Sequence, residues 1–277
     1  MKLCAFADEA SQEISGQIAA LKRNGYDYLE IRGVNGKNVS KISCDEAKEV
    51  KKMLDDAGLA VWSMGSPIGK HHMERDFSAH LDDLKRVVEL SYIFGTNKIR
   101  MFSFHAIPGE DEATTRERTM EHLGILCDNT PKDIILCHEN EKRIYGETAE
   151  KCLEVMKEFP RIRAVFDPAN FVQCGVDTLK AWEMLKDHVE YLHIKDALAD
   201  GTVVPAGQGI GNVEQIIKLY AERGGEVLTL EPHLQDFVGL SGLENGESVK
   251  HMDIKYKDND ESFDAGVAAL GSILARI

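Results

Sequence analysis

The sequence predicts a single-domain (β/α)8 barrel, also called a TIM barrel, that spans residues 1–277. Short apolar runs alternate with segments of helical period eight times, which is typical of parallel strands joined by crossover helices. No proline-rich or serine-rich linker divides the chain, and barrels of roughly 250 residues fold as one unit. An open doubly wound sheet would carry a glycine fingerprint after its first strand, whereas residues 7–11 contain no glycine.

The expected strands are short runs rich in apolar residues. We place them at residues 3–7, 28–32, 60–64, 98–102, 134–138, 164–167, 191–194 and 227–231. The segments between them are expected to be helices. Ser43 and Glu46 have the spacing of a capping box at the start of one helix, and Gly58 has the position of its glycine stop. Gly25 and Gly95 likewise stand just before expected strands, where helix C-caps belong.

The charge and the chain start limit the partners that we expect. A formal charge of −14 repels polyanions, so binding to nucleic acid or to an anionic membrane surface is disfavoured. Asp8 and Glu9 interrupt the start before an apolar signal region could form, and no run approaches the roughly 20 apolar residues of a spanning helix. The six cysteines are scattered singly, which indicates reduced thiols. We therefore expect a cytoplasmic protein, which could also form a homo-oligomer.

Ligand-type side chains stand at the ends of the last four expected strands. In this fold the catalytic groups project from the carboxyl ends of the strands. These ends carry Glu139, Asp167, His193 and Glu231. Three carboxylates and one imidazole form a hard, mostly oxygen site, which suits Mg²⁺ or Mn²⁺ and tolerates Co²⁺ or Zn²⁺. The sequence therefore predicts one divalent cation at the barrel mouth.

Four polar residues near these strand ends are candidates for contact with a substrate: Asn170, Lys195, Asp196 and His105. Asn170 can hydrogen-bond a hydroxyl group but cannot titrate. Lys195 and Asp196 have a second interpretation, an ordinary ion pair at the barrel rim.

Three further features carry weaker expectations. Glu30 and Arg32 are expected to pair with each other in the barrel interior. The glycine-rich residues 207–211 resemble a phosphate loop, but they lack its lysine and come late in the chain. Residues 234–262 follow the last expected strand without strong periodicity, so we expect them to form an active-site loop or lid.

Six motifs at successive strand ends carry a resemblance to a known family. They are Leu29-Glu30-Ile31-Arg32, His138-Glu139-Asn140, Phe166-Asp167-Pro168-Ala169-Asn170, His193-Ile194-Lys195-Asp196, Val204-Pro205-Ala206-Gly207-Gln208-Gly209 and Leu230-Glu231-Pro232. In this order the chain resembles the xylose-isomerase-like barrel superfamily, whose members include sugar isomerases and epimerases, inosose dehydratase and apurinic endonuclease relatives. The resemblance implies the same metal ligands that the strand ends suggest.

The resemblance also implies a mechanism. One of Glu139 and Glu231 would remove a proton from the carbon next to a carbonyl to give an enediolate, and the other would return a proton. This predicts a divalent-metal-dependent isomerase or epimerase that acts on a small-molecule carbohydrate, namely a small ketose, a sugar phosphate or a related polyol ketone.

Two departures leave the substrate open. Asn170 occupies a position that is often His in ketohexose epimerases, and residues 197–202 lack the arginine that those enzymes place nearby. An inosose-type dehydratase on the same metal site is the alternative. A nuclease would need more histidines and a basic groove, and a catalytically silent sugar-binding barrel would not need the intact ligand set.

Overall fold

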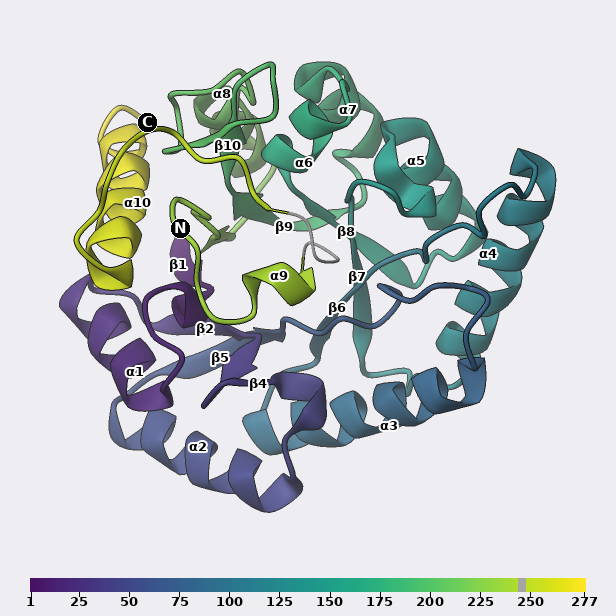
Figure 1. Cartoon of the computed structure of the whole chain (residues 1–277), viewed down its shortest axis with the longest axis horizontal. Helices are drawn as coiled ribbons and strands as arrows, with labels where there is room; N and C mark the ends of the chain where they lie inside the picture. The colour runs from purple at the N-terminus through teal and green to yellow at the C-terminus, as the bar shows by residue number, and fades with distance from the viewer. Residues whose placement is uncertain (244–247) are drawn as a thin grey trace.

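The computed structural model describes residues 1–243 and 248–277. Within these residues eight parallel strands close into a barrel, and helices form a ring around it (Figure 1). The barrel strands are β1 (Lys2–Ala5), β2 (Tyr28–Ile31), β5 (Ala60–Met64), β6 (Lys98–Met101), β7 (Ile135–Glu139), β8 (Ile162–Phe166), β9 (Val189–Ile194) and β12 (Val227–Leu230). The predicted single-domain (β/α)8 barrel is confirmed.

The first and last barrel strands pair with each other, so the sheet has no open edge. β1 pairs with β12 from Lys2 opposite Val227 to Ala5 opposite Leu230. The first expected strand ended at residue 7, but β1 ends at Ala5 because Ala7–Glu9 form a short 3-10 helix, η1. The other expected strands match the observed ones within two residues at either end.

Several helices begin or end at residues that the sequence marks as caps. They are α1 (Ile14–Arg23), α2 (Cys44–Asp56), α3 (Phe77–Phe94), α4 (Glu112–Asp128), α5 (Ala149–Glu158), α6 (Pro168–Gln173), α7 (Thr178–Leu185), α8 (Val213–Glu222), α9 (Leu240–Leu243) and α10 (Asn259–Leu274). The capping box of Ser43 and Glu46 is present at the start of α2. Gly58 follows α2 with φ of 71°, a left-handed conformation that glycine adopts without strain.

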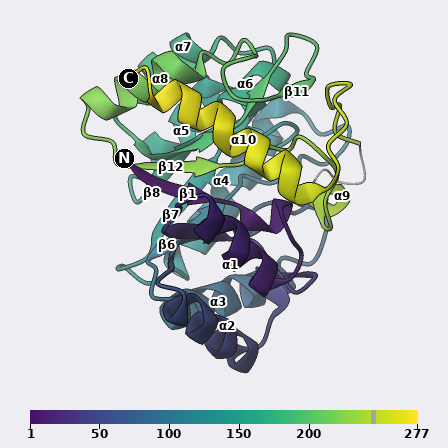
Figure 2. The same ribbon diagram turned by 90° about the vertical axis from the view of Figure 1, so that its left-hand side faces the viewer.

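Ion pairs connect the last helix, α10, with the first helix, α1. Figure 2 shows α10 crossing the outside of the barrel near α1. The guanidinium of Arg23, at the end of α1, pairs with Asp260 at 2.8 Å and with Asp264 at 2.9 Å. These ion pairs are exposed, so each adds little stability beyond the apolar packing of the helices.

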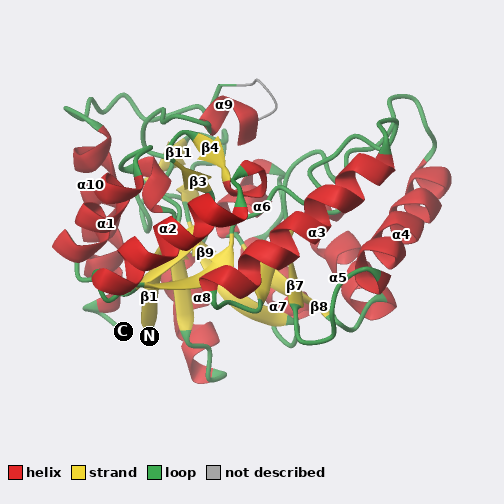
Figure 3. Cartoon of the chain, turned by 90° about the horizontal axis from the view of Figure 1, so that it is seen from below, coloured by secondary structure: helices red, strands yellow, loops and turns green. Residues whose placement is uncertain are grey.

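Short insertions build the face of the barrel at the carboxyl ends of the strands. They include the hairpins β3 (Gly33–Val34) with β4 (Lys37–Asn38) and β10 (Asp196–Ala197) with β11 (Val203–Val204). Figure 3 shows α9, β4 and β11 on this face and the chain termini on the opposite one. The predicted lid, residues 234–262, reaches this face through α9, although residues 244–247 lie outside the described part of the chain.

In the described residues, none of the helices is long and apolar enough to cross a membrane.

Candidate metal centre

Four ligand-type side chains converge at the carboxyl ends of neighbouring strands. Glu139 is the last residue of β7, His193 lies in β9, and Asp167 and Glu231 directly follow β8 and β12. One ligand atom from each lies within 4.8 Å of the others, and all four residues are buried. The quartet expected from the sequence is therefore brought together in space.

His193 turns one ring nitrogen toward the carboxylates of the quartet. Its Nδ1 lies 3.0 Å from Oε1 of Glu139 and 3.5 Å from Oε2 of Glu231. Its Nε2 lies 3.3 Å from Oε2 of Glu30, whose other oxygen accepts a hydrogen bond of 2.8 Å from the Tyr191 hydroxyl. A histidine that binds a metal through one nitrogen commonly has its other nitrogen fixed by a carboxylate in this way.

The donor set fits a divalent cation. Oε2 of Glu139 and Oδ2 of Asp167 are buried and make no hydrogen bond to any described residue, although each lies in an ion pair, with Arg100 and Lys195 respectively. Burial raises the pKa of Asp167 to about 7, although the nearby Lys195 ammonium opposes the rise. Burial opposes charge on His193 as well, but Glu139 and Glu30 raise the pKa of this histidine well above its ordinary value. The three carboxylates and the histidine nitrogen are thus a buried donor set of the kind that binds a divalent cation.

Two buried arginines hold the two glutamates. Nη1 of Arg32 donates a hydrogen bond of 2.7 Å to Oε1 of Glu231, and Nη1 of Arg100 lies 3.2 Å from Oε2 of Glu139. Both guanidinium groups lie over the ring of Phe6, with their central carbons 4.2 and 5.0 Å from its centroid. Each glutamate is therefore restrained by an arginine that is not a member of the quartet.

The expected pair between Glu30 and Arg32 is wrong. Arg32 instead donates two hydrogen bonds of 2.9 Å to the carboxylate of Asp8, in addition to its bond to Glu231. Glu30 is buried and contacts His193 and Tyr191 instead. Arg32 lies just beyond the end of β2 at Ile31, so the strand pattern did not determine its partners.

Lys195 lies directly beside the quartet. Its Nζ is 3.0 Å from Oδ2 of Asp167 and 3.3 Å from Oε2 of Glu231. Burial alone would lower the pKa of Lys195, but Asp167 and Glu231 raise it well above its ordinary value, so the side chain is an ammonium. Lys195 therefore makes ion pairs with two members of the quartet, and the rim ion pair with Asp196 is not formed.

Asn170 and His105 have different surroundings. The amide nitrogen of Asn170 donates hydrogen bonds to Oε1 of Glu139 at 3.2 Å and to the carbonyl oxygen of Asn140 at 2.9 Å. His105 lies in the loop after β6, where its ring stacks on that of His72 at 4.6 Å. Asn170 thus positions a glutamate of the quartet, and contact of either residue with a substrate stays a prediction.

Asp196 organises the glycine-rich loop. Its carboxylate accepts hydrogen bonds of 2.9 to 3.0 Å from the backbone amides of Ala197, Gly207, Gly209 and Gly211. A Cβ atom on Gly209 would lie 2.3 Å from Oδ1 of Asp196, so the close approach requires glycine. The resemblance of residues 207–211 to a phosphate loop has a structural explanation, because these amides bind an internal carboxylate.

A second group of polar side chains adjoins Glu231. The backbone amide of His233 donates a hydrogen bond of 2.7 Å to Oε2 of Glu9, and Nε2 of His233 lies 3.4 Å from Oε1 of both Glu9 and Glu231. His233 has a left-handed φ of 45°, which is uncommon for a residue with a side chain. Burial raises the pKa of Glu9 to about 8. The sequence analysis missed this group because its members are 224 positions apart.

Comparison with known proteins places the fold among enzymes of related architecture. A curated relative, 3-dehydroshikimate dehydratase from Bacillus anthracis, is 20% identical over 216 residues, covering 70% of this chain and 77% of the relative. The structure of IOLI protein with a bound zinc atom has a TM-score of 0.75 at 15% identity and covers 100% of this chain and 99% of that one. D-psicose 3-epimerase with D-tagatose from Clostridium cellulolyticum H10 has a TM-score of 0.74 at 15% identity, covering 99% of each chain.

At these identities the structural likeness establishes the fold, while the reaction has to be argued from the site. A family model described as xylose isomerase-like TIM barrel matches residues 18–255, which is most of the chain. The match includes Glu139, Asp167, His193 and Glu231. The chain therefore belongs to the xylose isomerase-like TIM barrel family.

Proposed function

We propose that this protein is a divalent-metal-dependent isomerase or epimerase of a small ketose, a sugar phosphate or a related polyol ketone. The observation that carries the proposal is the arrangement of Glu139 and Glu231. Both carboxylates approach the same nitrogen of His193, and each is restrained by its own arginine. Two fixed carboxylates beside one cation site suit removal and return of a proton at a carbon next to a carbonyl.

Glu139, Asp167, His193 and Glu231 would hold the cation, and their donor atoms suit Mn²⁺, Mg²⁺, Co²⁺ or Zn²⁺. When bound, a divalent cation polarises a carbonyl group and acidifies the neighbouring C–H bond. The zinc atom in the IOLI structure supports a metal-dependent reaction in this chain as well. The epimerase and dehydratase among the similar proteins support an enzyme that modifies a sugar or a similar polyol.

The protein's own groups would control the protonation of the two glutamates. Burial would raise the pKa of Glu231, but Lys195 and other nearby positive groups lower it well below its ordinary value. Glu231 therefore enters the reaction as a carboxylate. Glu139 is oriented by the hydrogen bond from Asn170 and by its contact with His193. One glutamate accepts the substrate proton, and the other delivers a proton to the opposite face or to the adjacent carbon.

Isotope exchange tests this proposal. The protein loaded with Mn²⁺ is incubated in D2O with a panel of ketoses, ketose phosphates and ring ketones, and deuterium at the carbon next to the carbonyl is measured by NMR. We expect exchange into at least one substrate, with loss of exchange in the Glu139→Gln and Glu231→Gln variants. Absence of exchange from the whole panel would contradict proton abstraction.

A dehydratase is the second candidate, because a curated relative is a dehydratase and the same proton abstraction begins an elimination. The buried Lys195 ammonium beside Asp167 and Glu231 supplies positive charge where a leaving hydroxide would develop. Mass spectrometry of the products distinguishes the two reactions, since only the dehydratase forms a product lighter by one water. Cleavage of abasic DNA by the purified protein would instead favour a nuclease.

A further inference from the structure

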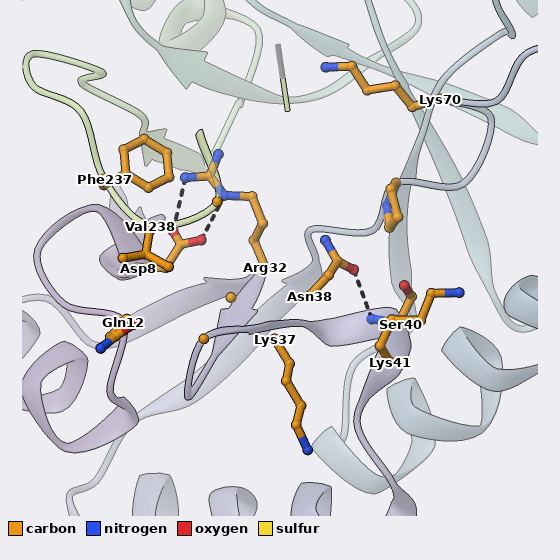
Figure 4. Close-up of a pocket in the computed structure, with 14 residues that line it drawn as sticks. Asp8, Gln12, Arg32, Lys37, Asn38, Ser40, Lys41, Lys70, Phe237 and Val238 are labelled. Atoms are coloured by element: carbon orange, nitrogen blue, oxygen red, sulfur yellow. Dashed lines mark hydrogen bonds and ion pairs between the residues drawn. The ribbon is translucent and has the colours of Figure 1, made fainter. Parts of the chain in front are cut away.

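A cavity of about 350 Å³ opens beside the metal centre at the carboxyl ends of the strands (Figure 4). The β3–β4 hairpin and the residues after it form one wall, and Pro67 and Lys70, after β5, form another. Phe237 and Val238, after β12, close a third side. The volume is at the lower end of the range for small-molecule sites and matches a ligand of one ring.

The cavity adjoins the quartet through Arg32 and approaches it through Lys70. Arg32 lines the cavity and donates the hydrogen bond of 2.7 Å to Glu231. Lys70 lines the opposite side, and its Nζ is 2.9 Å from Oε2 of Glu141, which follows Glu139 by two positions. A ligand in the cavity would therefore extend from the site where the proposed proton transfer occurs.

The charge of the cavity wall is opposite to that of the chain. Its charged side chains are four basic residues, Arg32, Lys37, Lys41 and Lys70, and one acidic residue, Asp8, whereas the whole chain has 33 basic and 47 acidic residues. Both oxygens of Asp8 already accept hydrogen bonds from Arg32. Asp8 and Arg32 thus offset each other, and the net positive charge of the lining residues comes from the three lysines.

Not all of these cations face the cavity. Lys37 pairs with Glu46 at 2.6 Å, and Lys41 pairs with Asp83 at 2.5 Å. Figure 4 shows Lys37 extending away from the space that Arg32, Asn38 and Lys70 surround. Lys70 and Arg32 are also paired, with Glu141 and with Asp8 and Glu231, but both border this space (Figure 4), so they are the cations that a bound ligand would meet.

Two neutral donors add to these cations. The carbonyl oxygen of the Asn38 side chain accepts a hydrogen bond of 3.0 Å from the backbone amide of Ser40, which leaves its amide nitrogen turned toward the cavity (Figure 4). The Ser40 hydroxyl belongs to a residue that is only 3% exposed, and it has no hydrogen-bond partner among the described residues. A buried hydroxyl without a hydrogen-bond partner costs free energy unless a ligand or a water molecule forms a hydrogen bond with it.

We propose that this cavity is a subsite for an anionic group, a carboxylate or a phosphate, carried by the substrate; the proposal rests on the proposed function. Lys70 and Arg32 would supply the positive charge, and Asn38 and Ser40 would donate hydrogen bonds to the oxygens. Phe237 and Val238, the latter 58% exposed, would cover the apolar part of the ligand. The site would then select a charged substrate over a neutral sugar of the same shape.

Calorimetric binding to the full chain with Mn²⁺ tests the subsite with two matched pairs of probes. D-fructose 6-phosphate is compared with D-fructose, and shikimate is compared with its methyl ester. We expect the charged member of at least one pair to bind about tenfold more tightly or better, as a charge-assisted contact predicts. The pair that shows the preference tells whether a phosphate or a carboxylate is recognised.

Lys70→Met should reduce the preference to within about threefold, because it removes the cation and retains the length of the side chain. Lys37→Met is the matched control, since it removes a lysine of the same wall that pairs outward with Glu46. If Lys70→Met proves unstable because Glu141 loses its partner, the Lys70→Met/Glu141→Gln double variant removes both charges and should also lose the preference.

Three results would overturn the subsite: equal binding within both pairs, no binding of any probe, or an equal loss in Lys37→Met and Lys70→Met. Binding requires no turnover, so the outcome is separate from the deuterium exchange experiment. A charge preference without deuterium exchange would retain the subsite and reject the proposed reaction. Exchange without a charge preference would retain the reaction and reject the subsite.

Discussion

Nη1 of Arg32 lies 2.7 Å from Oε1 of Glu231, and the same guanidinium holds both oxygens of Asp8 at 2.9 Å. The group lies between the rings of Phe6 and Phe237, at 4.2 and 5.0 Å from their centroids. One side chain directly after β2 therefore connects the residues after β1 with a proposed catalytic residue after β12. The planar guanidinium group of arginine makes these hydrogen bonds simultaneously, whereas the ammonium group of lysine cannot.

Arg32→Lys should therefore impair catalysis while the barrel stays folded. We expect kcat/KM to fall by roughly 10- to 100-fold, the usual cost of losing a residue that orients a ligand or catalytic group. The acid limb of the pH profile should move upward, because a weaker positive contact stabilises the ionised Glu231 less. Steady-state kinetics across pH check both effects.

Arg23→Lys is the control for this change. Arg23 also bridges two carboxylates, those of Asp260 and Asp264, but on the surface between α1 and α10. We expect its kinetics to match the wild type. Equal kinetics in Arg32→Lys and the wild type would mean that Arg32 does not position Glu231.

The sequence predicted the barrel and the quartet because both depend on short-range patterns. Apolar runs mark the strands, and the fold places the residues at their carboxyl ends together, so Glu139, Asp167, His193 and Glu231 could be grouped without coordinates. The arginine contacts could not be found in this way. Arg32 and Glu231 are 199 positions apart, and which side chain reaches which carboxylate depends on side-chain conformations in the folded barrel.

The contacts of the loop of residues 207–211 also could not be predicted from the sequence. Its glycines were visible in the sequence, but their use depends on a carboxylate 11 to 15 positions earlier, that of Asp196. Three glycine amides can bind a phosphate or a carboxylate of the protein itself. The choice between these follows only from the position of the β10–β11 hairpin.

Metal binding should stabilise the protein. A ligand that binds only the folded state adds RT ln(1 + [L]/Kd), about 2.7 kcal/mol at a hundredfold excess over Kd. On a scale of ~2–4 °C per kcal/mol, Mn²⁺ should raise Tm by several degrees relative to the chelated protein. Calorimetric melting with Mn²⁺, Mg²⁺, Co²⁺, Zn²⁺ or a chelator measures the shift, and no shift with any of the four would reject the metal centre.

Asp167→Ala should abolish this response because it removes an anionic ligand. His71→Ala should retain it, because His71 stacks on His80 outside the quartet.

Lys195→Met should enlarge the rise in Tm on metal binding. Without the ammonium the carboxylates of Asp167 and Glu231 repel each other more strongly, so the chelated protein loses more stability than the loaded one.

Asp196→Ala should destabilise the protein through the glycine-rich loop. The change leaves the amides of Gly207, Gly209 and Gly211 without their acceptor, and the Gly211 amide is buried while the other two are partly buried. We expect a cost of about 3 kcal/mol in the free energy of unfolding. Urea unfolding measures the loss. Asp200→Ala is the control, because Asp200 lies on the neighbouring turn in an exposed pair with Lys250 and should cost less than about 1 kcal/mol. Similar losses in both variants would contradict the structural role of Asp196.

His80 should make the stability of the protein sensitive to acid. Its Nε2 accepts a hydrogen bond of 2.9 Å from the backbone amide of Gly69, next to Lys70, and the side chain is buried in α3. Burial lowers the pKa of His80 from its ordinary value of 6.5 to about 4. The unfolded chain therefore binds a proton between pH 6.5 and 4 that the folded chain does not. The stabilising contribution is present above pH 6.5 and is lost as the pH falls toward 4.

Between pH 7 and pH 5 this histidine alone should cost about 2 kcal/mol in the free energy of unfolding, on the scale of ~1.4 kcal/mol per pH unit. His80→Gln keeps a hydrogen-bond acceptor that does not titrate, so the difference in stability between the two pH values should shrink by about that amount. Some acid sensitivity should remain, because burial also lowers the pKa of His138 to about 4. Urea unfolding at both pH values measures the difference. An unchanged pH dependence in His80→Gln would show that the neutral imidazole beside Gly69 does not control the stability of this loop.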